Sequence, residues 1–109
     1  MDRVMAKTID PADMKAMGRK SDQAADMLRA LAHGARLRVL CELADGERSA
    51  GDLVRASALS QSALSQHLAK MREEGIVDTR RDAQSIYYRI ADPKALRLLK
   101  TLYELYCGK

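Results

Sequence analysis

Two sets of side chains in this sequence could carry chemistry: a pair of thiols and a run of small polar residues. The chain has two cysteines, Cys41 in RLRVLCEL and Cys107 in LYELYCGK. A thiolate can form a disulfide, accept sulfur or bind a metal ion. Because the two thiols are far apart in the sequence, chemistry that uses both depends on how the fold places their helices.

The polar run is SQSALSQHLAKM, residues 60–71. If it is helical, its apolar anchors fall at i, i+4 and i+7 and share one face: Leu64, Leu68 and Met71. The opposite face carries Ser62, Gln66 and Lys70, with Ser65 beside them. Small hydroxyls, an amide and a cation can exchange hydrogen bonds with base edges in the DNA major groove. The alternative is a polar face that is merely solvated, and the neighbouring elements decide between the two.

Those elements are predicted to be helices followed by a hairpin. Asp10-Pro11 suits the start of a first helix that continues to about residue 32. Further helices are predicted over about 35–44, from Ser49 to about 56, over 61–74 and over 93–106. IVDTRR and SIYYRI, separated by DAQ, predict a two-stranded hairpin. The order α-α-α-α-β-β-α is that of a mainly α winged helix-turn-helix with a small β-hairpin wing. We expect a flexible N-terminus over 1–9 and a single DNA-binding and dimerisation domain over 10–107.

The place of residues 60–71, after a short turn and before a basic hairpin, favours DNA reading over a merely solvated face. We expect the helix N-termini at Ser49 and Ser60 to offer hydroxyl and backbone N–H groups to phosphates. The candidate contacts of the recognition helix are Gln61, Ser62, Ser65, Gln66, His67 and Lys70, and those of the wing are Arg80, Arg81 and Gln84. His67 has the weakest case, because a histidine there suits packing or a phosphate as well as a base.

Apolar stripes on the first and last helices are wider than a small core requires. They include Met14, Met17, Met27 and Leu28 in the first helix, and Leu96, Leu98, Leu99, Leu102 and Leu105 in the last. Such stripes can cover a partner subunit, so we expect a homodimer. In the second helix, Leu37, Leu40, Cys41 and Ala44 fall at i, i+3, i+4 and i+7, which predicts that Cys41 lies on the buried side.

Composition and charge limit the class of protein. The formal net charge of +4 suits a nucleic-acid partner without requiring one. No apolar run approaches the roughly 20 residues of a membrane span, and the first residues lack the apolar stretch of a secretory signal. We therefore expect a cytoplasmic protein whose cysteines are kept reduced. An enzyme is not indicated, because the sequence has no nucleophile–base spacing, phosphate loop or metal cluster, and no cofactor is expected.

LRALAHGARLRVLCEL, followed by SALSQSALSQHLAKMREEGIVDTRRDAQSIYYRI, resembles the ArsR/SmtB family of dimeric repressors over about residues 25–106. The helix phrase, the recognition helix, EEGIV and the YYRI strand occur in order at the family's spacing. The resemblance implies an α-helical homodimer joined through its first and last helices. It also implies binding to inverted-repeat operator DNA and release of that DNA when an effector binds.

The family's common metal sites lack their ligands in this sequence. The arsenic-type Cys-x-Cys pair corresponds to Ser49 and Gly51. The zinc-type set corresponds to Asp92, Lys94, Leu105 and Gly108, and a single carboxylate cannot hold zinc. No metal site is therefore expected.

One thiol in the second helix and one at the end of the last resembles the family's sulfide- and persulfide-responsive subgroup. That resemblance implies that Cys41 and Cys107 are effector-sensing thiols, which a persulfide converts into a di- or polysulfide bridge within one protomer. A direct disulfide requires Cα atoms about 4.4–6.8 Å apart, and extra sulfur atoms relax that limit. The C-terminus of the last helix disfavours a thiolate at Cys107. Arg38, one helical turn before Cys41, could favour a thiolate there if its side chain reaches, so we expect Cys41 to react first.

Three alternatives remain open at this point. The same thiols could sense peroxide or disulfide stress. A metal could be held by both cysteines and a histidine, although His33 and His67 lie in separate segments. The domain could also be an interaction module that does not bind DNA.

Overall fold

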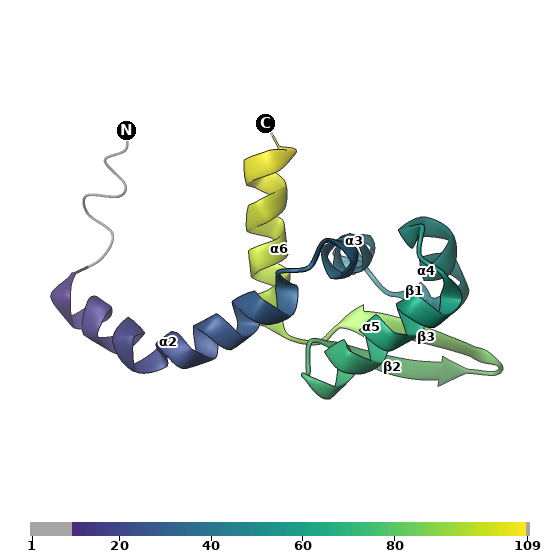
Figure 1. Ribbon diagram of the computed structural model, residues 1–109, viewed down its shortest axis with the longest axis horizontal. Helices are drawn as coiled ribbons and strands as arrows, with labels where there is room; N and C mark the ends of the chain where they lie inside the picture. Colours follow the sequence, from purple (N-terminus) through teal and green to yellow (C-terminus); the bar gives the residue numbers. More distant parts are fainter. Residues whose placement is uncertain (1–9, 109) are drawn as a thin grey trace.

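The computed structural model describes residues 10–108, which form five helices and three short strands (Figure 1). In chain order they are α2 (Pro11–Leu31), α3 (Gly34–Leu43), β1 (Arg48–Ser49), α4 (Ala50–Ser57), α5 (Gln61–Glu73), β2 (Val77–Asp82), β3 (Ser85–Ile90) and α6 (Pro93–Tyr106). The predicted bounds agree with these to within a residue, and the winged helix-turn-helix is confirmed. The segment predicted to be flexible, 1–9, lies outside the described residues.

The helices begin where a side chain accepts a hydrogen bond from an N–H group of the first turn, which has no partner within the helix. Asp10, Ser49, Ser60 and Asp92 each cap a helix, with acceptor distances of 2.9–3.1 Å. Such caps stabilise a helix by about 1 kcal/mol each. His33 caps α3 as well, because its Nδ1 accepts a hydrogen bond from the Ala35 N–H group at 3.2 Å. The sequence did not predict this cap.

The sheet has three antiparallel strands in the order β1-β3-β2, so the predicted hairpin gains one strand. β1 is only two residues long and pairs Arg48 with Tyr88 and Ser49 with Tyr87. A strand this short has no alternation to recognise in a sequence. It joins the loop before α4 to the wing, and so fixes the wing beside the helix-turn-helix.

The core lies between α3, α4, α5 and the sheet. Its largest fully buried apolar side chains are Val39, Leu40, Leu53, Leu64 and Met71. Tyr88 and Ile90 of β3 pack against this cluster. Because side chains alternate along a strand, Tyr87 and Arg89 belong to the opposite, outer face of the sheet.

The prediction that Cys41 is buried is wrong, because its side chain is exposed. The buried side of α3 consists of Ala35, Val39, Leu40 and Leu43. This short helix carries apolar residues around most of its circumference, so the sequence pattern fits more than one buried face. The tertiary contacts select a face that leaves Cys41 at the surface.

Two helices extend beyond this unit. Figure 1 shows α2 reaching away from the helix-turn-helix and α6 extending from the end of β3. The first turns of α6 pack into the core through Ala95 and Leu99, and the helix continues beyond it. The Cα radius of gyration is 16.3 Å, against about 13 Å for a compact domain of this length. The exposed large hydrophobic residues lie on these two helices: Met14, Met17, Leu28, Tyr103, Leu105 and Tyr106. Among residues 10–108, no helix has the length and apolar character needed to cross a membrane.

Candidate DNA interface and thiol pair

The helix α5 separates its anchors from its polar face as the sequence predicts. Leu64, Leu68 and Met71 are buried. The predicted contacts of the polar face are exposed: Gln61, Ser62, Ser65, Gln66 and Lys70. The anchors hold the helix against the core, and therefore its hydroxyl, amide and ammonium groups are free to meet a groove.

The turn before α5 depends on a residue that was not among the predicted ones. Ser57 is fully buried, and its Oγ accepts a hydrogen bond from the Leu59 N–H at 3.2 Å. Between them Ala58 has φ 61°, in the left-handed region that non-glycine residues rarely adopt. The serine thus satisfies a backbone donor inside the tight turn that joins α4 to α5. Serine's preference for turns was the available signal.

His67 has its contacts on the inner side of α5. The Arg36 Nε–H group donates a long hydrogen bond of 3.5 Å to the His67 Nδ1. The His33 ring packs edge-on with its centroid 4.8 Å away. Burial lowers the pKa of His67, with smaller contributions from His33 and Arg36. The imidazole therefore joins α5 to the start of α3, which is the packing role that the sequence left open beside a DNA contact.

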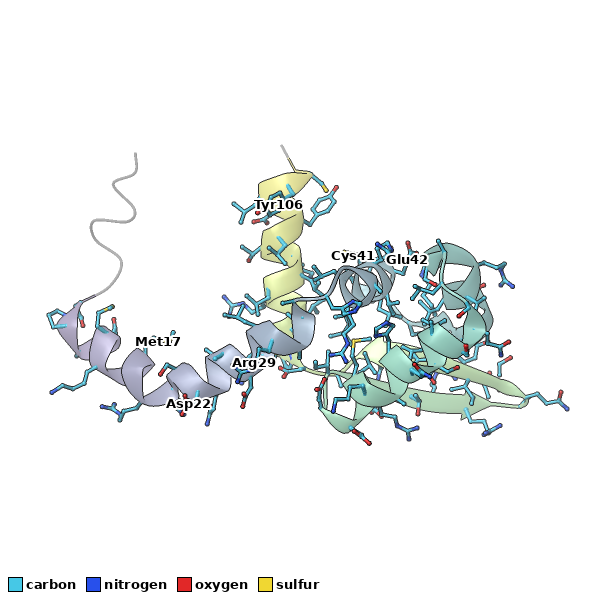
Figure 2. All side chains as sticks on the ribbon, in the orientation of Figure 1. Met17, Asp22, Arg29, Cys41, Glu42 and Tyr106 are labelled. Atoms are coloured by element: carbon cyan, nitrogen blue, oxygen red, sulfur yellow. The ribbon has the colours of Figure 1, made fainter. Side chains whose placement is uncertain are left out.

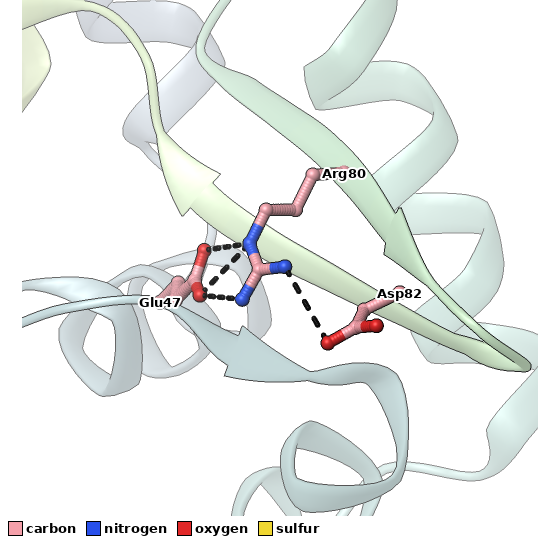
Figure 3. Close-up of polar contacts among 3 residues, drawn as sticks. All are labelled: Glu47, Arg80 and Asp82. Carbon is pink, nitrogen blue, oxygen red and sulfur yellow. Dashed lines mark hydrogen bonds and ion pairs between the residues drawn. The ribbon is translucent and has the colours of Figure 1, made fainter.

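The three predicted wing residues differ in their surroundings. Arg81 and Gln84 are exposed toward the hairpin tip. Arg80 instead binds Glu47 across the sheet, with its Nε 3.0 Å from each carboxylate oxygen (Figure 3). Its Cζ lies 4.6 Å from the centroid of the Tyr87 ring. The hydrogen bond between them lowers the pKa of Glu47 and raises that of Arg80.

Both thiols are exposed and unbonded. Cys41 lies on α3, and Cys107 ends α6, where its N–H donates to the Tyr103 carbonyl at 2.8 Å. Figure 2 labels Cys41 on α3 and Tyr106 on the last turn of α6. The pKa of Cys41 is raised, first by partial burial, then by the charge of Cys107, then by that of Glu42. A negative charge on Cys107 therefore disfavours the thiolate form of Cys41.

The charge of Arg38 does not activate the Cys41 thiol. Arg38 is not among the groups that shift the pKa of Cys41, and the shift is upward rather than downward. A thiol with a raised pKa is less ionised at neutral pH and is a slower nucleophile. The predicted activation of Cys41 by Arg38 is therefore wrong.

A metal site does not form among the described residues. Within residues 10–108, no group of three or more His, Cys, Asp or Glu side chains is arranged to hold a metal ion. His33 and His67 do meet in space despite their separation in sequence. Their partners are the Ala35 N–H and Arg36, which are both donors and cannot be metal ligands.

Known proteins of similar sequence place the chain in a family. The family described as "Bacterial regulatory protein, arsR family" matches residues 33–79. A biofilm growth-associated repressor of Agrobacterium fabrum is 47% identical over 95 residues, which cover 87% of this chain and 81% of that protein. The chain belongs to the arsR family. The resemblance drawn from residues 25–106 is thus confirmed.

Solved ArsR-family structures agree with this fold. The transcriptional repressor BigR from Xylella fastidiosa matches with a TM-score of 0.82 at 38% identity, covering 88% of this chain and 98% of that one. Reduced HlyU from Vibrio cholerae matches with a TM-score of 0.80 at 42% identity, covering 85% and 98%. This ArsR-family chain is accordingly a DNA-binding transcriptional regulator and not an enzyme. The family match includes α5 and Cys41, and it ends before Cys107.

Proposed function

We propose that the protein is a dimeric repressor that binds inverted-repeat operator DNA and releases it when reactive sulfur species bridge Cys41 and Cys107. In this proposal, residues 10–107 act as one DNA-binding and dimerisation domain. Because the partner is DNA of the bacterial chromosome, we place the protein in the cytoplasm.

The sensing part is supported by the positions of the two thiols on α3 and at the end of α6 and by their electrostatic effect. A negative charge on Cys107 raises the pKa of Cys41, although the two residues come from different helices. Both are exposed, so a small persulfide can reach them. HlyU, a structural relative, has been solved in a form described as reduced, and a redox state is what a thiol switch would change here.

The proposed chemistry needs only the persulfide donor. The first thiolate attacks the terminal sulfur of the donor, which leaves as a thiol, and the cysteine becomes a persulfide. The second thiolate then attacks the Sγ atom of that cysteine, expels hydrosulfide and closes a disulfide. If the second cysteine is itself a persulfide, its terminal sulfur makes the attack and closes a trisulfide. In both routes two electrons pass from the protein thiols to the expelled sulfur.

The proposed effect on DNA comes from joining two helices. α3 belongs to the core that carries α5, whereas α6 bears exposed side chains that suit a subunit interface. A bridge between them would change the angle between the two recognition helices of the dimer. Operator half-sites lie about one DNA turn apart, roughly 34 Å, so a change in that angle separates the helices from their grooves.

Dimerisation is supported by the apolar surface of α2 and α6. Between these helices lies a hollow of about 680 Å³ whose lining combines apolar residues, including Met17, Met27, Leu28 and Leu98, with polar and charged ones. Large contiguous apolar patches are uncommon on the surfaces of monomers unless they serve as an interface. A second copy of the chain would cover them.

Mass spectrometry of persulfide-treated protein tests the chemistry. We expect a bridged Cys41–Cys107 species in the wild type, and no bridge in the matched variants Cys41→Ser and Cys107→Ser. Both variants should bind operator DNA and keep it after treatment. Operator binding that is unchanged in fully bridged protein contradicts the proposal.

A parallel treatment with hydrogen peroxide separates the main alternative. A peroxide sensor would release DNA at peroxide concentrations matching those of the persulfide. A sulfur sensor should require far more peroxide than persulfide for the same release. The interaction-module alternative predicts no specific DNA binding in either treatment.

A further inference from the structure

The ion pair between Glu47 and Arg80 spans the whole sheet on its outer face. Arg80 lies on the edge strand β2, opposite Tyr87 of β3, and Glu47 directly precedes β1 on the other edge. The guanidinium crosses the Tyr87 ring to reach the carboxylate. Arg80 is therefore held by a residue far away in the sequence, although it is a predicted wing contact.

The N–H groups of the Arg80 guanidinium lie beside two carboxylates. Nε and Nη2 bind the Glu47 carboxylate, and Nη1 lies 3.9 Å from Asp82 (Figure 3). The Arg80 side chain still keeps 52% of its surface exposed and the Glu47 side chain 34%. A phosphate could thus approach Arg80, and it would meet two carboxylates there.

The pair lies next to a position where a phosphate is expected. Tyr87 of the central strand β3 pairs with Ser49, the cap of α4, on one side. On the other side it pairs with Arg80 of β2. These residues form one row across the sheet. The N-terminus of α4 carries partial positive charge, which favours an anion, although the Asp52 N–H group already donates to Ser49 Oγ and the Asp52 carboxylate lies in the same turn. A released Arg80 side chain would add a full charge beside that terminus.

We propose that Glu47 limits the affinity of this protein for DNA by withholding Arg80 from the phosphate backbone. The inference rests on the proposed DNA-binding function and adds to it a residue that does not touch DNA. In the bound state Arg80 stays with Glu47, and the wing meets DNA through Arg81 and Gln84. Such a limit keeps non-specific binding weak, because phosphate contacts are the same for every sequence.

Salt dependence of DNA binding tests this inference, because each phosphate contact adds about 0.9 to the slope of log K against log salt. We expect Glu47→Gln to steepen the slope by about 0.9 for each protomer on the DNA. At 0.15 M salt its affinity for a non-operator duplex should rise about 5-fold per protomer. The glutamine keeps an oxygen that accepts a hydrogen bond from Arg80, so the wing is retained.

Three further variants make the test specific. Asp45→Asn removes the same charge from the same loop, where Asp45 faces Arg48 at 3.5 Å, and should leave the slope unchanged. Arg80→Gln should also leave it unchanged. Glu47→Gln combined with Arg80→Gln should return the slope to that of the wild type.

The opposite pattern overturns the inference. If Arg80→Gln flattens the slope and Glu47→Gln does not steepen it, Arg80 exchanges Glu47 for a phosphate on binding. If neither variant changes the slope, the pair only supports the wing. Both outcomes leave wild-type DNA binding intact, whereas a wild type that binds no DNA refutes the proposed function itself.

Discussion

At the scale of single residues, Cys41 is the position where surroundings matter most. Its pKa is raised by burial, by Cys107 and by Glu42. At a given pH a smaller fraction of Cys41 is therefore ionised than of an ordinary exposed cysteine. Replacing Cys107 by serine removes one of these charges and should lower the pKa of Cys41. The pH profile of iodoacetamide alkylation at Cys41, followed by mass spectrometry without oxygen, measures this change.

Two further variants control that experiment. Glu42→Gln removes another charge that raises the pKa and should shift the profile in the same direction as Cys107→Ser. Asp45→Asn removes a nearby charge that is not among the causes and should leave the profile in place. A Cys41 profile that Cys107→Ser does not move would mean that the thiols do not interact in solution.

Ser57 gives a prediction for stability. Ser57→Ala leaves the Leu59 N–H without its acceptor in a turn whose serine is fully buried. We expect the free energy of unfolding to fall by about 1–3 kcal/mol, measured by urea unfolding at one protein concentration. Ser62→Ala, at an exposed position of α5, should change it by less than about 0.5 kcal/mol. Equal effects of the two substitutions would contradict this role for Ser57.

Residue roles were predictable where they depend on neighbours in the sequence. Ser49 and Ser60 were predicted at helix N-termini because a capping residue acts on an N–H group three residues later. The partners of Arg80 and His67 were not predictable. Each is bound by a residue more than thirty positions away, and only the tertiary fold brings these pairs together.

At the scale of elements, the recognition helix carries the main prediction. Gln66→Ala should weaken operator binding by about 1–3 kcal/mol and relax discrimination at the contacted base pair. Lys70→Ala should weaken binding to all sequences and reduce the salt slope by about 1 for each phosphate that the lysine neutralises. Fluorescence anisotropy with operator and scrambled duplexes over a salt series separates the two effects.

A matched control for Lys70→Ala is Lys15→Ala, which removes the same charge from an exposed position of α2. It should leave the salt slope unchanged. If Gln66→Ala and Lys70→Ala bind DNA as the wild type does, the exposed face of α5 is not the reading surface.

Element positions were predictable because the residues that cap the helices and the alternation along the strands mark the boundaries. Gly75, which has φ 77°, marks the end of α5 in the same way. The side of α3 that is buried was not predictable, because the apolar residues of this helix leave more than one face that could be buried. Cys41 was therefore assigned to the core and proved to be exposed. β1 was missed because a strand of two residues has no alternating pattern that a sequence could show. Its pairing with β3 depends on a strand far away in the sequence.

At the scale of the whole molecule, the apolar surfaces of α2 and α6 predict a dimer. Leu28 is 57% exposed in the single chain, and Leu28→Glu would place a charge in the proposed interface. An unpaired buried charge costs about 3–5 kcal/mol, so dimerisation should weaken at least about 100-fold. Analytical ultracentrifugation measures the change. Ala56→Glu, at an exposed position of α4, adds the same charge and should leave the dimer intact.

The most direct test of thiol control over DNA binding is the operator affinity of one protein sample in three successive states: dithiol, persulfide-bridged and reduced again. If formation of the bridge and binding of DNA are coupled, operator affinity should fall by about 5- to 150-fold on bridging. It should recover fully when a reductant opens the bridge. Mass spectrometry of each state confirms the bond between Cys41 and Cys107. Equal affinities of the dithiol and the fully bridged protein would contradict the central claim that this thiol pair controls DNA binding.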